Sequence, residues 1–283
     1  MKFAISYGLP FFGADPDRLT EFARLAEEVG FEAIYVPEHV ALSPGTQVGG
    51  MPLPPTLPYP DPLDCLTFVA AATERILLGT GVLLLPYHHP VGLAKRLATI
   101  DHLSKGRMRL LTVGVGSLPT EAQAVGVDFG TRGRRTDEAI DILRLLWEGG
   151  PDGVSYDGEF YRFESICSYP KPLGVEHLPI HVGGSSRAAA RRAGERGNGY
   201  FPGGALGADE RRIQFELARA SAVRAGRDSD ALEYTRWASI DLSAEAVAAY
   251  AAQGVTRLVV SSSVADPGEQ RAELTAFAAR FLR

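Results

Sequence analysis

The first residues that could carry chemistry are a carboxylate and an imidazole that stand side by side. Glu38 and His39 follow the apolar segment 33–36 after one proline, Pro37, and the segment has the character of a buried strand. An imidazole has an ordinary pKa of about 6.5, so it can exchange a proton at neutral pH, and a neighbouring carboxylate can hydrogen-bond to it. We therefore interpret Glu38 and His39 as candidate catalytic residues. A pair that only fixes the loop is the alternative.

A glycine-rich turn before an expected helix is the second candidate. Its residues are Gly183, Gly184, Ser185 and Ser186. Glycine allows close approach to the backbone, and the N–H groups at a helix start attract an anion, so the turn is typical of a phosphate site. An ordinary turn in which Ser185 caps the helix fits equally well. Gly114 and Gly116 form a weaker signal, because no third glycine completes a dinucleotide fingerprint.

The remaining histidines and cysteines do not predict a metal site. His88 and His89 are adjacent, so their side chains point to opposite sides of an extended segment. No HxH or HExxH spacing is present. Cys65 and Cys167 lie far apart without CxxC spacing, which argues against both a cysteine metal site and a disulfide framework. We expect no metal ion and a loop-lining role for His88 and His89.

These candidates need a scaffold that brings the ends of several strands together. Short apolar segments alternate with amphipathic segments of helical spacing, which is typical of βαβ units. We expect eight strands, at 3–9, 33–36, 76–85, 108–115, 180–183, 199–201, 234–242 and 257–262. The prediction is an α/β fold, a (β/α)8 TIM barrel, with residues 1–283 in one domain. On such a barrel the loops that follow the strands form the catalytic face.

Helix boundaries and two long connections complete the predicted architecture. Helices are expected to begin after Asp15 and Asp266, each followed by proline. Glycines are expected to end helices at Gly30, Gly149, Gly194, Gly226 and Gly254. Residues 37–63 are rich in proline, and we interpret them as a lid over the barrel mouth. Residues 150–179 form an insertion before the fifth strand, with a predicted hairpin that borders the same mouth.

Composition narrows the class of protein. Of the 283 residues, 45% are hydrophobic and 22% are charged, which is typical of globular proteins, and no apolar run reaches the roughly 20 residues that span a bilayer. The net charge is −5 and the basic residues form no stripe, which disfavours a nucleic-acid partner. The first residues lack a signal-peptide pattern. We expect a cytoplasmic protein that acts on a small molecule, without membrane or nucleic-acid partners.

Seven segments occur in a fixed order along most of the chain. They are Glu38-His39, Gly79-Thr80-Gly81-Val82, 96–107, Gly114-Val115-Gly116, 132–139, 169–172 and Val182-Gly183-Gly184-Ser185. In this order they resemble the bacterial luciferase-like superfamily, and especially its oxidoreductases that depend on the deazaflavin coenzyme F420. The resemblance covers nearly the whole chain, so it is more specific than any single motif.

This resemblance implies a barrel that holds reduced F420 or FMN at its mouth. The phosphate of the cofactor would lie near the turn after the fifth strand, and a non-proline cis peptide at Gly81–Val82 would press against the ring. An arginine that binds the FMN phosphate in family monooxygenases would match Arg132 or Arg134, although a solvated helix start fits these two as well. The implied cofactor-binding residues are Glu38, His39, Thr80, Gly81, Val82, Gly114, Gly116, Arg132, Arg134, Gly183, Gly184, Ser185 and Ser186.

One departure from the family pattern concerns the acid–base residues. The sugar-phosphate dehydrogenase of this family has an Asp-His pair where this chain has Glu38 and His39. It also has an acid shortly after the glycines of the fourth strand, where this chain has Ser117. The nearest carboxylate here is Glu121. Neither the acid–base scheme nor the sugar-phosphate substrate of that enzyme can therefore be transferred.

The resulting hypothesis is an F420-dependent oxidoreductase that transfers a hydride between reduced F420 and a small organic substrate. The cofactor supplies the hydride chemistry, and His39 would handle a proton. An FMN-dependent monooxygenase and a non-catalytic flavin-binding barrel remain alternatives. A barrel hydrolase or aldolase is disfavoured, because no Schiff-base lysine or metal set is evident. Family members often dimerise, so a homodimer is expected.

Overall fold

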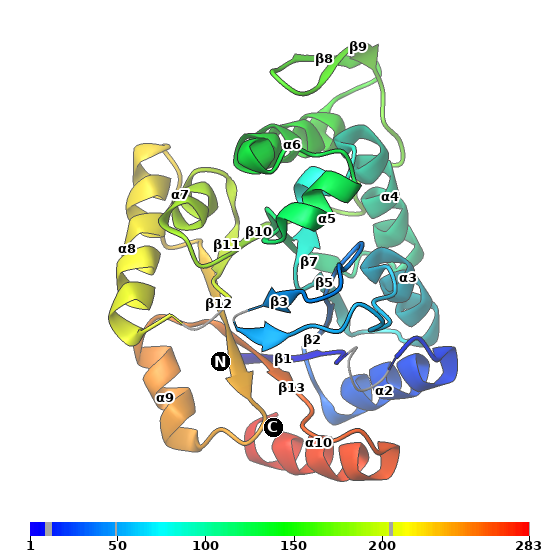
Figure 1. Ribbon diagram of the computed structural model, residues 1–283, viewed down its shortest axis with the longest axis vertical. Coiled ribbons are helices and arrows are strands. Elements are labelled where there is room, and N and C mark those ends of the chain that lie inside the picture. The colour runs from blue at the N-terminus through cyan, green and yellow to red at the C-terminus, as the bar shows by residue number, and fades with distance from the viewer. Residues whose placement is uncertain (9–12, 49, 204–205, 283) are drawn as a thin grey trace.

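A ring of parallel strands surrounded by helices forms the centre of the molecule (Figure 1). The computed structural model describes residues 1–8, 13–48, 50–203 and 206–282. The barrel strands are β1 (Lys2–Ser6), β2 (Ala33–Val36), β5 (Leu77–Thr80) with β6 (Leu83–Leu84), β7 (Met108–Gly114), β10 (Ile180–Gly183), β11 (Gly199–Phe201), β12 (Glu233–Ser239) and β13 (Arg257–Ser261). The ring closes because β7 pairs with β10 and β1 pairs with β13. The predicted TIM barrel is confirmed.

The third barrel strand differs from its prediction. A continuous strand was expected at 76–85, but the chain forms β5 and β6 on either side of Gly81–Val82, whose peptide bond is cis. The expectations at 33–36, 180–183 and 199–201 match β2, β10 and β11. Other strands end earlier than expected, and the expected end at Leu9 lies outside the described residues.

The helices run between the strands and cover the outside of the ring. They are α2 (Pro16–Val29), α3 (Pro62–Ala72), α4 (Pro90–Leu103), α5 (Pro119–Ala124), α6 (Arg132–Glu148), α7 (Arg187–Arg196), α8 (Ala208–Arg224), α9 (Ala244–Ala252) and α10 (Pro267–Phe281). Asp15 and Asp266 cap α2 and α10 as predicted, each accepting two backbone N–H groups. Within the described residues, no helix is both long and apolar enough to cross a bilayer.

The expected glycine stops are confirmed at some positions and wrong at one. Gly30 ends α2 in the left-handed conformation, with φ of 100°. Gly149 ends α6, but in an extended conformation. Gly194 does not end a helix, because it lies inside α7. A Cβ there would clash with the backbone oxygen of Ala218 on α8, so this glycine permits close contact between two helices.

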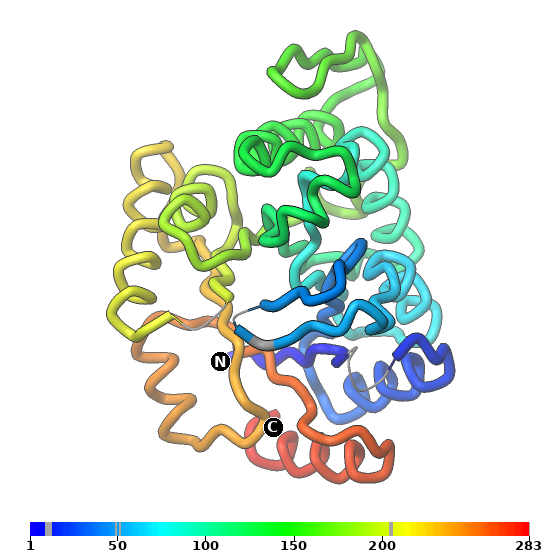
Figure 2. The backbone as a smooth tube through the Cα atoms, viewed as in Figure 1, coloured from blue at the N-terminus to red at the C-terminus, as the bar shows by residue number. Residues whose placement is uncertain are grey.

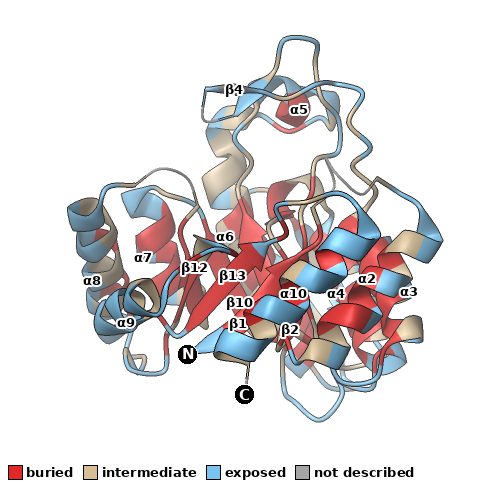
Figure 3. Cartoon of the chain, turned by 90° about the horizontal axis from the view of Figure 1, so that it is seen from below, coloured by how far each residue is buried: buried red, intermediate tan, exposed pale blue. Residues whose placement is uncertain are grey.

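Burial divides the interior into two layers, and Figure 3 shows the buried strands at the centre. The larger layer lies between strands and helices, where every second strand residue points outward. The smaller layer fills the barrel itself with Ala4, Ala33, Tyr35, Leu110, Phe201 and Val259. Trp237 packs on Phe201, with ring centroids 4.8 Å apart, and lies beneath Gly81. The rings of Tyr35, Phe201 and Trp237 therefore fill the barrel interior below the ends of the strands.

The two long connections take different positions. The lid segment contains a short hairpin of β3 (Gln47–Val48) and β4 (Met51–Pro52), and Figure 3 shows β4 and α5 over one end of the barrel. The insertion forms the predicted hairpin, β8 (Val154–Asp157) and β9 (Arg162–Ile166). That hairpin extends beyond α6, on the outside of the barrel (Figure 2). Tyr161, between β8 and β9, packs edge-on against His89 in the loop after β6, with ring centroids 5.5 Å apart, so the hairpin contacts one of the loops at the mouth from the outside.

Candidate active site

A cavity of about 540 Å³ opens at the ends of the barrel strands. Its lining residues come from the segments after β2, β5, β7 and β10 and from the starts of α6 and α7. They are Pro37, Glu38, His39, Tyr59, Gly81, Val82, Leu84, Gly114, Val115, Gly116, Ser117, Arg132, Gly183, Gly184, Ser185, Ser186 and Ala189. The cavity therefore brings together all of the predicted site residues except Thr80 and Arg134.

Thr80 and Arg134 lie elsewhere, for identifiable reasons. Thr80 is fully buried, and its hydroxyl donates to the carbonyl oxygen of Thr112 at 2.7 Å, so it joins two strands. Arg134 is exposed and forms an ion pair with Glu159 of the outer hairpin. Successive helix residues are rotated by about 100°, so Arg134 points well away from Arg132 on the same helix. Neither Thr80 nor Arg134 therefore lines the described cavity.

Val82 explains two of the glycines in the cavity wall. A Cβ at Gly114 would lie 2.7 Å from Val82 Cγ2, and a Cβ at Gly183 would lie 2.5 Å from Val82 Cγ1. Real Cβ atoms do not approach so closely, so the Val82 side chain occupies the space that these two glycines leave. The glycine pattern predicted that a ligand meets the backbone at both positions. The structure adds that they make room for a valine that lines the cavity.

Glu38 is held in place by two groups from the neighbouring strand segment. Its buried carboxylate accepts the backbone N–H of Leu84 and lies 2.8 Å from His88 Nε2. His88 directly follows the short helix η1 (Leu85–Tyr87). The adjacent Glu38 and His39 therefore pair with different residues rather than with each other. Glu38 fixes the start of the lid segment to β6, and His88 is its partner.

His39 faces a carboxylate that the sequence located only as the nearest acid. His39 Nδ1 lies 3.3 Å from Glu121 Oε2. The other oxygen of Glu121 accepts the N–H of Val40 at 2.6 Å and that of Ala41 at 3.3 Å, and the side chain is almost fully buried. The imidazole packs edge-on against Tyr59, with centroids 5.0 Å apart. Glu121 therefore orients His39 from α5, across the cavity mouth.

Arg132 and Tyr87 lie beside this pair. Arg132 donates to the carbonyl oxygens of Gly116 at 3.2 Å and Phe129 at 2.6 Å, and it stacks on the Phe129 ring. The Tyr87 hydroxyl is buried and has no hydrogen-bond partner among the described residues. Burial raises the pKa of Tyr87 to about 12, with Glu121 adding to the effect and Arg132 opposing it. Sequence reasoning missed Tyr87, because an isolated tyrosine in an apolar segment carries no signal.

The backbone of Gly116 also reflects the position of Tyr87. Gly116 has φ of +78°, in the left-handed region that side chains rarely adopt. A Cβ at Gly116 would clash with the Tyr87 hydroxyl oxygen. Glycine is therefore required here for two reasons, conformation and space.

The glycine-rich turn after β10 is braced from outside the cavity. The carbonyl oxygen of Gly184 accepts from Tyr200 Oη at 3.0 Å, and that of Ser185 accepts from Gln214 Nε2 at 2.9 Å. Ser186, not Ser185, caps α7, because its hydroxyl accepts the N–H of Ala189 at 3.1 Å. The start of α7 thus faces the cavity with the positive end of its dipole, which suits an anionic group.

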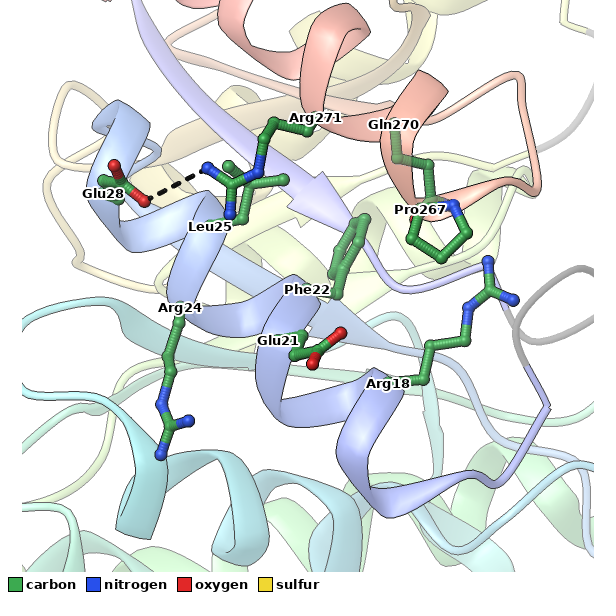
Figure 4. A pocket seen from close by; sticks show the side chains of 9 residues that line it. All are labelled: Arg18, Glu21, Phe22, Arg24, Leu25, Glu28, Pro267, Gln270 and Arg271. Atoms are coloured by element: carbon green, nitrogen blue, oxygen red, sulfur yellow. Dashed lines mark ion pairs between the residues drawn. The ribbon is translucent and has the colours of Figure 1, made fainter.

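A second cavity, of about 420 Å³, lies on the outer wall of the barrel between α2 and α10 (Figure 4). Charged side chains dominate its lining, and Arg271 lies 3.6 Å from Glu28 across it. Strand ends do not contribute to it among the described lining residues. We therefore regard the cavity at the strand ends as the candidate active site.

Two solved structures share this fold. The monooxygenase RslO1 from Streptomyces bottropensis aligns with a TM-score of 0.77 and 23% identity, covering 100% of this chain and 99% of that one. The coenzyme F420-dependent tetrahydromethanopterin reductase from Methanopyrus kandleri aligns with a TM-score of 0.74 and 18% identity, covering 99% and 97%. At these identities the likeness concerns the fold.

Curated relatives extend the likeness to sequence. An uncharacterised protein of Mycobacterium tuberculosis is 38% identical over 185 residues, which are 62% of this chain and 64% of that protein. The match thus spans less than two thirds of that relative. An F420-dependent glucose-6-phosphate dehydrogenase of Microbacterium testaceum is 32% identical over 256 residues, 81% of this chain and 71% of that protein.

The family itself follows from a match along almost the whole chain. The sequence pattern of the luciferase-like monooxygenase family covers residues 4–280, from the first barrel strand to the last helix. The resemblance noted from the order of the motifs is thereby confirmed. The chain belongs to the luciferase-like monooxygenase family.

Proposed function

We propose that this chain is an oxidoreductase that transfers a hydride between reduced coenzyme F420 and a small organic substrate. One observation carries the proposal: a single cavity joins the turn at Gly184, the wall around Val82 and the oriented imidazole of His39. The relative named as an F420-dependent dehydrogenase supports this choice of cofactor. The cavity volume lies within the range of small-molecule sites.

The cavity residues fit a flavin-like cofactor with a phosphate group. Gly184, Ser185 and the start of α7 would hold the phosphate by backbone N–H groups and the helix dipole. Arg132 lies on the same cavity and supplies the positive charge. Val82, framed by two glycines, would contact the ring system. When bound, the cofactor supplies the hydride chemistry, and the protein supplies position and electrostatics.

His39 would exchange the proton that accompanies the hydride. A carboxylate beside Nδ1 favours the tautomer with its proton on that nitrogen, which leaves Nε2 to accept a proton from a substrate hydroxyl. Glu121 is then a positioning residue, since it acts on substrate only through His39. Tyr59 packs against the imidazole and limits its rotation.

Titration of the purified chain with F420 and with FMN, each oxidised and reduced, tests the cofactor. We expect F420 fluorescence to report saturable binding and FMN to bind weakly. Tight FMN binding without F420 binding would favour the FMN-dependent monooxygenase. F420 binding without turnover of any tested substrate would favour the non-catalytic barrel.

Two variants test the proton chemistry. His39→Ala should retain F420 binding and lose turnover. Glu121→Gln should lower kcat more than it changes KM or F420 affinity, because glutamine keeps an oxygen that can accept the N–H groups of Val40 and Ala41 but loses the carboxylate that orients the imidazole. Unchanged turnover in His39→Ala would remove His39 from the proposal. The expected homodimer remains a prediction, which gel filtration with light scattering would test.

A further inference from the structure

The basic residues of this chain avoid the loops that follow the barrel strands. The sequence contains 29 lysines and arginines in total. Yet each segment between a barrel strand and the next outer helix contains none of them. These segments are 7–15, 37–61, 85–89, 115–131, 184–186, 202–207, 240–243 and 262–266. On a β/α barrel these segments form the catalytic face, so the face that meets the substrate is without basic loops.

Arg132 is the one lysine or arginine side chain in the lining of the described cavity. It opens α6, which lies against α7, since Arg192 of α7 donates to the carbonyl oxygen of Gly133 at 3.0 Å. Arg132 is therefore near the turn assigned to the cofactor phosphate. Two of its donors already bind the carbonyl oxygens of Gly116 and Phe129. The Arg132 guanidinium therefore has few free N–H donors for a second anion besides the cofactor phosphate.

The part of the cavity around His39 is acidic and apolar. Glu38 and Glu121 are both buried there, at 6% and 1% exposure. An anionic substrate next to His39 would face these carboxylates, and the one nearby guanidinium, that of Arg132, already binds two backbone carbonyl oxygens. Burial strengthens such repulsion. The nearby surface comes instead from Pro37, Tyr59 and Val115.

We propose that the substrate is a small uncharged alcohol, or the corresponding ketone, without a phosphate or carboxylate group. This rests on the proposed function. In the forward direction the carbinol C–H bond breaks and its hydride reduces the oxidised deazaflavin, while the O–H proton passes to His39 Nε2 and the C–O single bond becomes a carbonyl. The substrate therefore differs from the sugar phosphate in the name of the Microbacterium relative.

A matched pair of substrates isolates the effect of charge. Loss of F420 fluorescence is followed with 2-butanol and with 3-hydroxybutyrate, which carries a similar carbinol and adds a carboxylate. A second comparison uses cyclohexanol and glucose 6-phosphate. We expect kcat/KM for each uncharged alcohol to exceed that for its anionic counterpart by about tenfold or more. Equal or better turnover of either anion overturns the proposal.

If none of these alcohols is oxidised, a binding measurement tests the proposed preference for an uncharged substrate. Saturation-transfer NMR on the F420-loaded chain would compare cyclohexanone with glucose 6-phosphate at equal concentration. We expect signal from cyclohexanone and little from the sugar phosphate, and Ser117→Lys, which adds a cation to the cavity wall, should raise the sugar-phosphate signal. The proposal is wrong if glucose 6-phosphate binds the unaltered chain as well as cyclohexanone, or if cyclohexanone does not bind. Failure of F420 itself to bind is a separate result that overturns the proposed function.

Discussion

The two ends of the barrel use buried charge differently. At the end where the strands begin, Arg257 is almost fully buried, with its guanidinium 2.7 Å from Glu32 and 2.6 Å from Glu233. Lys2 reaches the same two carboxylates from the surface. At the end where the strands finish, Glu38 and Glu121 are buried without any lysine or arginine contact in the described structure. They bind backbone N–H groups and histidines instead.

This difference separates stability from function. At the end where the strands begin, which we call the closed end, opposite charges neutralise each other and hold together the first residues of neighbouring strands. At the end where the strands finish, which we call the open end, carboxylates orient loops and an imidazole beside a cavity. Barrel enzymes show this division generally, with catalytic groups at the carboxyl ends of the strands. Substitutions at the two ends should therefore affect different measured quantities.

The largest effect is expected at the closed end, from Arg257→Met. This change leaves Glu32 and Glu233 without their buried partner, so the free energy of unfolding should fall by about 3 to 5 kcal/mol. Lys2→Met is the matched control. It contacts the same carboxylates from a half-exposed position and should cost less than about 1 kcal/mol. Urea denaturation measures both, and equal losses in the two variants would contradict this account of the closed end.

A pH titration of stability examines the same end. Burial lowers the pKa of His181 to about 4, although the nearby Glu233 opposes this. Below about pH 6.5 the His181 imidazole binds a proton in the unfolded chain, whereas in the folded chain it stays neutral down to about pH 4. The free energy of unfolding should therefore fall by about 1.4 kcal/mol per pH unit as the pH is lowered from about 6.5 to about 4. His181→Gln should flatten this region.

The Glu233 carboxylate affects stability in a lower pH range than His181 does. Although burial opposes the shift, the hydrogen bond and charge of Arg257 lower the pKa of Glu233 to about 2. The stability that Glu233 contributes is therefore present above its ordinary pKa and is lost mainly below about pH 4.5. If the His181→Gln profile kept the full slope between pH 6.5 and pH 4, another group would be responsible.

At the open end, Gly183→Ala should cost about 1 to 3 kcal/mol of stability by crowding Val82. It should also weaken cofactor binding. Val82→Ala removes the crowded atoms, so the double variant should lose less than the sum of the single losses. Gly92→Ala is the control, because nothing lies near its added Cβ within α4. Additive losses in the double variant would show that Val82 is not the cause.

The smallest effect is expected from Tyr87→Phe. Its hydroxyl is buried without a partner among the described residues, so its removal should leave the free energy of unfolding unchanged or raise it by up to about 1 kcal/mol. Tyr200→Phe is the comparison. That hydroxyl bonds Gly184 and Gln214, and its loss should cost about 1 kcal/mol. A clear loss of stability in Tyr87→Phe would mean that the hydroxyl has a partner in solution.

Sequence reasoning located most of the cavity lining, because strand order places successive loops on one face. It could not find the partner of His39. The direction of α5 decides whether Glu121 points back across the mouth, and that direction depends on packing between distant segments. Glu38 was interpreted with His39 because they are adjacent, although adjacent residues on an extended chain point to opposite sides. The outer position of the hairpin before β10 likewise depends on α6, not on local pattern.

The two oxygens of Glu121 have a mechanical consequence. One holds the backbone of Val40 and Ala41, at the start of the lid segment, and the other holds His39. Any rearrangement that draws residues 40 and 41 away from α5 must loosen or rotate the same carboxylate. The imidazole then loses its alignment at the moment the mouth changes shape. Access to the cavity and the orientation of His39 for proton transfer are thus coupled through the side chain of Glu121.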